Sequence, residues 1–267
     1  MKVTIQSNIL LLTALMIMGQ IQETKGMDVD EPDQYNADHL HALMHTLHGQ
    51  GTVSALAFSP DNKTLASGHW DCKIRIWHKT NDHYQHIQDI HEVALISAMA
   101  FSPDGNILAY STPFHIGIFK KDILTHRYIF LEELKNGNSV KSLAFNSNGI
   151  LISASGDSTA RGAISLWQQT NGHYTCIQTL NTYDSVTSAI ISADNTTVAC
   201  IIGYWTVLIY QIESDSNLLN PKFQRLDTRG SIEAITFKKD GLLAIALQKG
   251  FSKSTVEFWK KLMVNIE

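Results

Sequence analysis

The feature that most constrains this chain is a repeat of about 45 residues. Five segments of alternating apolar and small residues each end on a large apolar anchor, and the anchors are Phe58, Phe101, Phe145, Ile191 and Phe237. Successive anchors are 43, 44, 46 and 46 residues apart, and a Leu or Ile marker precedes each of them by 11 residues. Self-similarity at a fixed period indicates an architecture of stacked supersecondary units, because each unit must bury its apolar surface against its neighbours.

Each repeat has the sequence pattern of four short strands. The anchor segment ends at a turn such as Ser59-Pro60-Asp61-Asn62, an apolar run follows, and a third segment ends on an aromatic residue. The aromatic residues are Trp77, Phe119, Trp167, Tyr210 and Trp259. The fourth segments are residues 84–90, 128–134, 174–180 and a shorter 222–226. Alternation of period two, without helical periodicity, predicts an all-β fold of five four-stranded propeller blades over residues 39–267.

Three motifs of the first repeat resemble the WD-repeat family. They are Phe58-Ser59-Pro60-Asp61, Leu65-Ala66-Ser67-Gly68 and Ile74-Arg75-Ile76-Trp77, and the resemblance extends over about residues 39–259. It implies a buried hydrogen-bonded network of His48, Ser67, Asp71 and Trp77, in which Asp71 is structural and not catalytic. The chain departs from the family pattern because no third segment ends in the Trp-Asp pair and because repeats three to five lack the histidine.

The ends of the repeat region predict how the ring closes. A fourth strand is missing after the third segment of repeat five, whereas residues 39–47 have the pattern of a fourth strand with no repeat in front of them. We therefore expect this N-terminal strand to complete the last blade, which removes an exposed sheet edge. Since the family usually has seven blades and only five repeats fit here, an open or incomplete ring, finished by self-association or another chain, remains the alternative.

The first 38 residues differ from the repeats. Residues 1–26 contain a basic Lys2 and an apolar run over residues 9–19, a pattern typical of a signal peptide but too short to span a membrane by itself. Residues 27–38 form an acidic linker with one proline. We expect an exported protein, secreted or periplasmic, or an N-terminal membrane anchor if the segment is not cleaved. The location is cytoplasmic if the segment is not a signal.

Composition and motifs argue against several classes of protein. A net charge of −4 does not favour a nucleic-acid partner. Three cysteines without paired spacing argue against a disulfide framework or a zinc knuckle. No phosphate loop, nucleophile elbow or zinc-protease motif is present. We therefore expect no enzyme activity, no cofactor and no metal.

The loops between the second and third strands carry the candidate binding residues. Their aromatic and basic members are His69, Trp70, Phe114, His115, Arg161, Tyr204, Trp205, Lys249, Phe251 and Lys253. Such loops ordinarily favour Gly, Asn and Asp, so aromatic residues at one face indicate a partner-binding hot spot, unless each ring folds back onto its own blade. The sequence thus predicts a non-catalytic scaffold that binds a protein or peptide, with a secreted carbohydrate-binding propeller lectin as the alternative.

Overall fold

The computed structural model describes residues 47, 51–81, 83–157, 161–249 and 253–260. All regular structure in these residues is β-strand, which confirms the all-β prediction. Within the same residues, no helix has the length and apolarity needed to cross a membrane. The predicted signal-like segment 1–26 and the acidic linker 27–38 lie outside the described residues.

The strands form five sheets in chain order. The first contains β1 (Val53–Phe58), β2 (Thr64–His69), β3 (Lys73–Thr80) and β4 (His83–His91). The second contains β5 (Ala98–Phe101), β6 (Ile107–Ser111), β7 (Ile116–Lys121) and β8 (Tyr128–Leu134). The third contains β9 (Val140–Phe145), β10 (Leu151–Gly156), β11 (Gly162–Thr170) and β12 (His173–Thr182). The fourth contains β13 (Val186–Ile191), β14 (Thr197–Ile202), β15 (Thr206–Ile212) and β16 (Leu219–Asp227), and the fifth contains β17 (Ser231–Phe237), β18 (Leu243–Lys249) and β19 (Lys253–Trp259).

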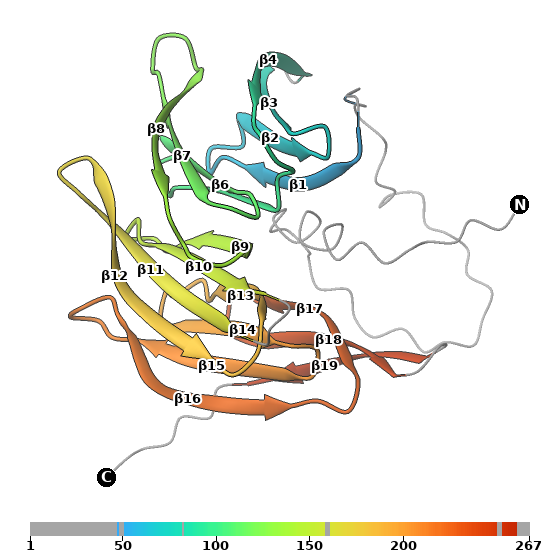
Figure 1. Ribbon diagram of the computed structural model, residues 1–267. Helices are drawn as coiled ribbons and strands as arrows, with labels where there is room; N and C mark the ends of the chain where they lie inside the picture. The colour runs from blue at the N-terminus through green and yellow to red at the C-terminus, as the bar shows by residue number, and fades with distance from the viewer. Residues whose placement is uncertain (1–46, 48–50, 82, 158–160, 250–252, 261–267) are drawn as a thin grey trace, which may run out of the picture.

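Each sheet is an antiparallel meander of consecutive strands. The five anchor residues that define the repeat are the last residues of the first strands β1, β5, β9, β13 and β17. These first strands contact one another in chain order, β1 with β5, β5 with β9, β9 with β13 and β13 with β17. Figure 1 shows the sheets following one another along an arc, from the blue first sheet to the red fifth sheet. This is the arrangement of propeller blades.

The turn after each first strand has the same backbone hydrogen bond in every sheet, as from Asn62 N to Ser59 O (2.8 Å). In the first sheet, the Ser59 hydroxyl donates to Asp61 Oδ1 (2.5 Å), and Asp61 Oδ1 also accepts from the Lys63 amide (3.0 Å). Four residues after each anchor the backbone is left-handed, a conformation that Asn or Gly adopts at low cost. The residues at this position are Asn62, Gly105, Gly149, Asn195 and Gly241. The repeat in sequence is therefore a repeat in local backbone geometry.

The apolar cores lie between successive sheets. Ile76 of the first sheet is buried with Phe101 and Phe119 of the second, and Ile118 of the second is buried with Trp167 of the third. Two further clusters join the third sheet to the fourth and the fourth to the fifth. Because adjacent sheets bury apolar side chains against each other, the stack gains stability one interface at a time.

Two features differ from the sequence prediction or extend beyond it. The fourth strand of the fourth sheet is longer than the expected segment 222–226, since β16 begins at the buried Leu219, which pairs with Ile212. The fifth sheet has three strands among the described residues. The predicted closing strand 39–47 lies outside the described residues except for Leu47, which belongs to no strand. Closure of the ring therefore stays a prediction.

Candidate functional site

Two sets of loops meet at one end of the sheets. One set connects the second and third strands of each sheet, and the other joins successive sheets; together we call them the loop face. Backbone hydrogen bonds hold the two sets together, from Gly203 N to Ser185 O (2.8 Å) and from Thr228 N to Trp205 O (2.8 Å). The third sheet has the same link, from Gly156 N to Ser139 O (3.0 Å). A side chain in either set therefore contributes to the same surface.

Four aromatic residues of the loop face are exposed to solvent. Trp70, Phe114, Tyr204 and Trp205 are between 56% and 73% exposed. The rings consequently do not fold back onto their own sheets, which was the alternative to a binding role. Exposed aromatic rings are costly in water unless a partner covers them, and aromatic residues dominate the binding energy of protein interfaces. These four side chains are the apolar part of the candidate site.

The other candidate residues divide into three groups. His69 is only 3% exposed and the His115 side chain is mostly buried, so neither side chain is part of the exposed loop face. Arg161 is exposed, and the partly exposed Lys249 forms an ion pair with Glu257 (3.5 Å). Phe251 and the side chain of Lys253 lie outside the described residues.

Three further exposed side chains, not predicted from the sequence, lie in the loops that join successive sheets. Val93 and Leu95 follow the first sheet, Tyr183 follows the third, and all three are exposed. The guanidinium of Arg225 lies over the Tyr183 ring, 5.2 Å from its centre. Apolar residues in these connecting loops were a signal in the sequence, because such loops ordinarily consist of polar residues.

A hydrogen-bonded network lies beneath the loop face in the first sheet. Trp77 Nε1 donates to Ser67 Oγ (2.9 Å), and His69 Nε2 lies 2.9 Å from the same oxygen. Burial lowers the pKa of His69, and the positive charge of Arg75 lowers it further, so the neutral imidazole is favoured. Asp71, expected in this network, instead accepts a bond from Arg75 Nη2 (2.6 Å) that holds the pKa of its carboxyl low. His48, the expected histidine, lies outside the described residues.

The third sheet builds the same network with a different residue. Trp167 Nε1 donates to Ser153 Oγ (2.9 Å), and Ser153 Oγ donates to Asn136 Oδ1 (3.1 Å). Asn136 belongs to the loop that joins the second and third sheets, so the network ties this loop to the sheet interior. Its amide occupies the place that the family resemblance gives to a histidine.

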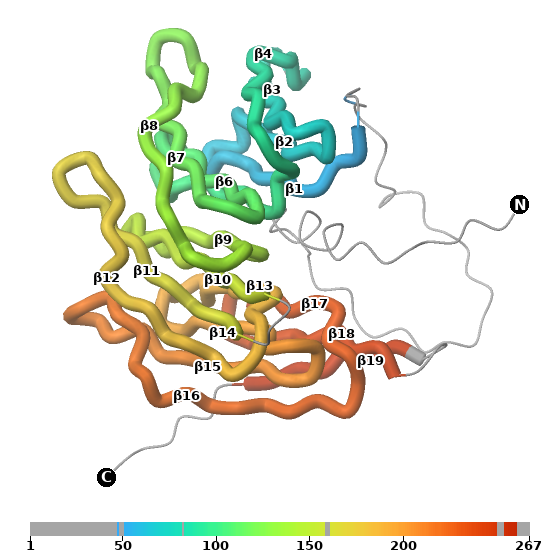
Figure 2. Tube along the Cα trace, viewed as in Figure 1, coloured from blue at the N-terminus to red at the C-terminus, as the bar shows by residue number. Residues whose placement is uncertain are grey.

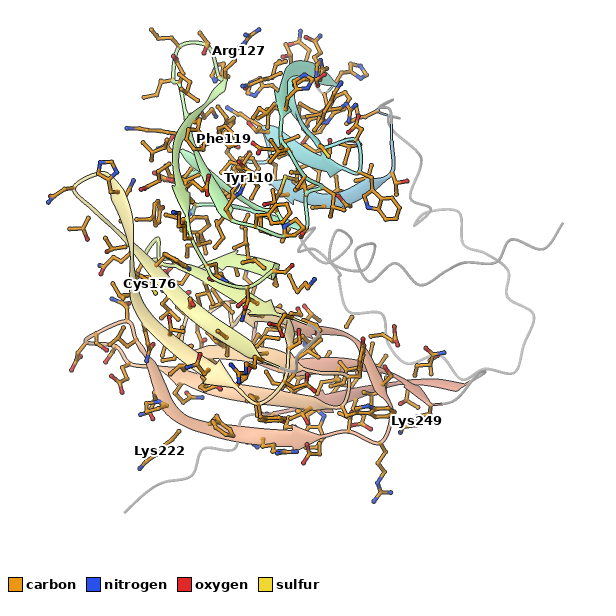
Figure 3. The ribbon with its side chains drawn as sticks, viewed as in Figure 1. Tyr110, Phe119, Arg127, Cys176, Lys222 and Lys249 are labelled. Atoms are coloured by element: carbon orange, nitrogen blue, oxygen red, sulfur yellow. The ribbon has the colours of Figure 1, made fainter. Side chains whose placement is uncertain are left out.

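The second sheet has a tyrosine at the position of Ser67 and Ser153. The buried Tyr110 hydroxyl donates to Glu92 Oε1 (2.6 Å), and His115 Nε2 lies 3.9 Å from Glu92 Oε2. The Tyr110 ring stacks on Phe119 with 5.2 Å between ring centres. Figure 3 labels both side chains, which come from β6 and β7 of this sheet. The ring also lies against Gly117, where a Cβ atom would be 2.0 Å from it, so this position requires glycine. Glu92 and His115 therefore support the loop that carries the exposed Phe114.

Among the described residues, no group of three or more His, Cys, Asp or Glu side chains is arranged to hold a metal ion. The polar side chains beneath the loop face bond to one another and shape its loops. The exposed side chains above them are aromatic, apolar and cationic. This arrangement can hold the surface of a partner by apolar contact and by charge.

Comparison with known proteins agrees with this architecture. Residues 41–78 and 130–161 match the family described as WD domain, G-beta repeat. Both matched segments thus have the WD-repeat pattern that the sequence motifs indicated. No curated protein matches the chain in sequence.

A solved structure is similar in fold. It is described as Kuenenia stuttgartiensis hydrazine synthase, and the comparison has a TM-score of 0.59 at 16% identity. The match covers 79% of this chain and 60% of that chain. At this identity the likeness concerns the fold alone.

Proposed function

We propose that this protein is a non-catalytic scaffold whose loop face binds a protein or peptide. The observation that carries the proposal is the exposure of Trp70, Phe114, Tyr204 and Trp205 on one end of the sheets. WD repeats commonly form propellers that mediate protein interactions, which supports the same conclusion.

The energetics of the loop face favour a protein partner. Buried aromatic side chains each remove on the order of 150–250 Å² from water, so four rings supply a substantial part of a standard interface. The partly buried networks of the first three sheets hold their loops in place, and a preformed surface loses less conformational entropy on binding. Arg161 adds a positive charge to the loop face, which favours a partner with a carboxylate beside its apolar centre.

The test compares two sets of exposed apolar side chains. The loop-face variant carries Trp70→Ala, Phe114→Ala and Trp205→Ala. The control carries Ile123→Ala and Leu124→Ala at the tip of the β7–β8 hairpin, at the other end of the strands. Figure 2 shows this hairpin reaching beyond the body of its sheet. Quantitative proximity labelling in the native host, with each identified partner retested as purified protein, is the measurement.

We expect the loop-face variant to lose at least about tenfold in affinity for a direct partner, because hot-spot residues each contribute more than about 1 kcal/mol. The hairpin control should bind as the wild type does. Equal binding by the loop-face variant would refute the proposal. The carbohydrate-binding alternative has no support from the structure or the comparisons.

The N-terminal part of the chain belongs to the same proposal. We infer that residues 1–26 direct export and that residues 39–47 complete a ring of five blades. The apolar run in residues 9–19 and the strand pattern of residues 39–47 support these inferences. N-terminal sequencing of the purified native protein tests export; a soluble cytoplasmic protein that begins at Met1 would refute it.

A further inference from the structure

A tyrosine lies at or next to the start of the fourth strand in each of the first three sheets. In the first sheet the Tyr84 hydroxyl donates to Asn62 O (2.7 Å), and Asn62 is the left-handed turn residue. In the second sheet the Tyr128 hydroxyl donates in the same way to Gly105 O (3.0 Å). In the third sheet the Tyr174 hydroxyl has no hydrogen-bond partner among the described residues, although this side chain is only 7% exposed. A buried phenol ordinarily bonds to a polar group, so Tyr174 is an exception that requires an explanation.

The corresponding turn of the third sheet is bonded to the fourth sheet instead. The Ser147 amide donates to Asn195 Oδ1 (3.1 Å). Asn148 Nδ2 donates to Asn217 Oδ1 (2.5 Å). The tyrosine and the anchor ring of the third sheet are also further apart, with 6.4 Å between ring centres compared with 5.9 and 5.7 Å in the first two sheets. Both observations agree with a space between the turn and the tyrosine ring of this sheet.

A cavity of about 340 Å³ lies at this place, between the second and third sheets and at the end of the strands opposite the loop face. It is lined by the turn between β5 and β6, the turn between β9 and β10, the end of β11 and the Tyr174 side chain. Among the described residues, His69 Nδ1 is the one enclosed side-chain polar atom that lacks a hydrogen-bond partner. The Tyr174 hydroxyl therefore reaches solvent, and the cavity that it lines is where a ligand can meet it.

Asp104 is the charged side chain among the residues that line the cavity, all of which lie in the described part of the chain. Burial opposes its ionisation, but hydrogen bonds from Ser102 Oγ (2.5 Å) and Asn106 Nδ2 (2.8 Å) outweigh burial and hold the pKa of this carboxyl below its ordinary value. Among the described residues, Asp104 Oδ2 accepts from Asn106 alone, so it can accept a further bond. Burial, with the negative charges of Asp104 and Glu132, raises the pKa of Tyr174 to about 12, so its hydroxyl stays neutral. The cavity thus has a fixed negative charge.

Neutral side chains of the cavity add further acceptors. The side-chain carbonyl oxygens of Gln168 and Asn148 accept no hydrogen bond from a described residue, and both residues line the cavity. The Tyr174 hydroxyl oxygen can accept as well as donate. The lining therefore favours a cation with several N–H donors and no acceptor, and a guanidinium has five donors in one plane. A guanidinium also stacks on an aromatic ring, which Tyr174 provides.

We propose that this cavity binds a guanidinium group, carried by a small molecule or by an arginine of a partner protein. Asp104 supplies the opposite charge, and Tyr174 supplies a hydroxyl and a ring. The cavity and the exposed Trp70 and Phe114 lie at opposite ends of the strands, so this site does not depend on the function proposed for the loop face.

The first experiment compares ligands on the full chain by ligand-observed NMR titration. Acetyl-arginine amide and butylguanidinium both carry a guanidinium, and acetyl-citrulline amide replaces it with a neutral group of similar shape. We expect acetyl-arginine amide to bind at least about tenfold more tightly than its citrulline counterpart, because only the cation pairs with Asp104. Tighter binding by butylguanidinium than by acetyl-arginine amide assigns the site to a small molecule, and the reverse order assigns it to an arginine residue. Either order supports a guanidinium site.

The second experiment removes the tyrosine hydroxyl. Tyr174→Phe should weaken binding of acetyl-arginine amide at least about tenfold, because it removes a hydrogen bond to a charged group. It should leave the urea midpoint unchanged, because the hydroxyl has no partner within the fold. Tyr84→Phe is the matched control: it should leave binding unchanged and lower the urea midpoint, since it removes the bond to Asn62 O.

The third experiment removes the negative charge. Asp104→Asn should weaken binding of acetyl-arginine amide at least about tenfold, because the charge-assisted bond is lost. Asp61→Asn is the matched control and should bind as the wild type does. Asp61 accepts from Ser59 and Lys63 in the corresponding turn of the first sheet, and it does not line the cavity.

Three results would overturn the proposal. They are a wild type that binds neither guanidinium compound, equal affinity for the arginine and citrulline amides, and wild-type affinity in Tyr174→Phe and Asp104→Asn. The loop-face variant leaves the cavity intact, so it should bind acetyl-arginine amide as the wild type does. The guanidinium site and the loop face can therefore fail independently of each other.

Discussion

The third and fourth sheets have the same strand order and a neighbour on both sides. They differ in the buried side chains of their second and third strands, which are polar partners in the third sheet and apolar in the fourth. The third sheet has Trp167 bonded to Ser153, and Ser153 bonded to Asn136. At the register positions of Trp167 and Ser153, the fourth sheet has Tyr210 and Cys200, both buried in an apolar cluster. The polar network is therefore not what makes four strands assemble into a sheet.

The difference between the two sheets concerns their loops. In the third sheet the network reaches Asn136 and so fixes the preceding loop of the loop face. In the fourth sheet the corresponding loop is stabilised by its own hydrogen bonds. Thr182 Oγ1 donates to Asp184 O (2.7 Å), and Asp184 Oδ1 accepts from the Ser185 amide (2.6 Å). Apolar packing therefore determines how the strands assemble into a sheet, and hydrogen bonds determine the conformation of the loops above it.

The largest predicted difference is in thiol reactivity. Cys176 on β12 of the third sheet is exposed, whereas Cys200 on β14 of the fourth is fully buried and its pKa is raised by burial. In a Cys72→Ser background, a thiol reagent should modify Cys200 at least about 1,000-fold more slowly than Cys176, because Cys200 reacts only after the sheet opens. Mass spectrometry of digests gives both rates. Similar rates would mean that the fourth sheet opens readily and that its packing is weaker than the full burial of Cys200 indicates.

The next prediction concerns the aromatic residues of the third strands. Trp167→Ala should lower the free energy of unfolding by about 3–5 kcal/mol, since it leaves a cavity and removes the donor to Ser153. Tyr210→Phe should change it by less than about 0.5 kcal/mol, because the Tyr210 hydroxyl has no hydrogen-bond partner among the described residues. Urea denaturation followed by fluorescence and circular dichroism measures both. A larger loss in Tyr210→Phe would reveal a polar contact in the fourth sheet.

Exchanging the two central residues sharpens the comparison. Ser153→Cys should cost about 1–3 kcal/mol, because the Trp167 N–H and the Asn136 oxygen lose their partner. Cys200→Ser should cost a similar amount, because it buries a hydroxyl among apolar side chains. Urea midpoints of the two single variants are the readout. If either substitution leaves the free energy of unfolding unchanged, that buried position accepts a hydroxyl and a thiol equally well, contrary to the contacts described above.

The smallest predicted effect is at the loop end of the network. Asn136→Ala should cost about 1 kcal/mol in the wild type and clearly less in a Ser153→Ala background, where only the longer bond from Asn136 Nδ2 to Asn138 O (3.4 Å) is left to lose. A double-mutant cycle from chemical unfolding measures this coupling. Additive losses would show that Asn136 stabilises its loop independently of the sheet.

Much of the fold could be predicted from the sequence, because strand residues repeat with period two and the turns repeat with them. The anchors Phe58 and Phe101 end their first strands, and the turn residues Asn62 and Gly105 take the left-handed backbone. The length of β16 could not be predicted, since it depends on the burial of Leu219 against a neighbouring sheet.

The candidate site could be predicted only in part. The loop positions of Trp70 and Phe114 followed from the strand pattern, but their exposure depends on side-chain orientation, which the pattern does not contain. His69 was expected in a loop, yet β2 continues through it, so it shares a face with Ser67 two residues earlier. Asn136 could not be predicted because an amide replaces the histidine that the family resemblance implies.

The use of consecutive strands in the first four sheets has a consequence for biosynthesis. A sheet whose strands are all neighbours in the chain requires only local contacts, so it can form soon after its last strand leaves the ribosome. The anchor spacing of about 45 residues then corresponds to a few seconds of translation per sheet at about 5–20 residues per second. The nascent chain can therefore gain order stepwise, each new sheet covering the apolar face left by the one before.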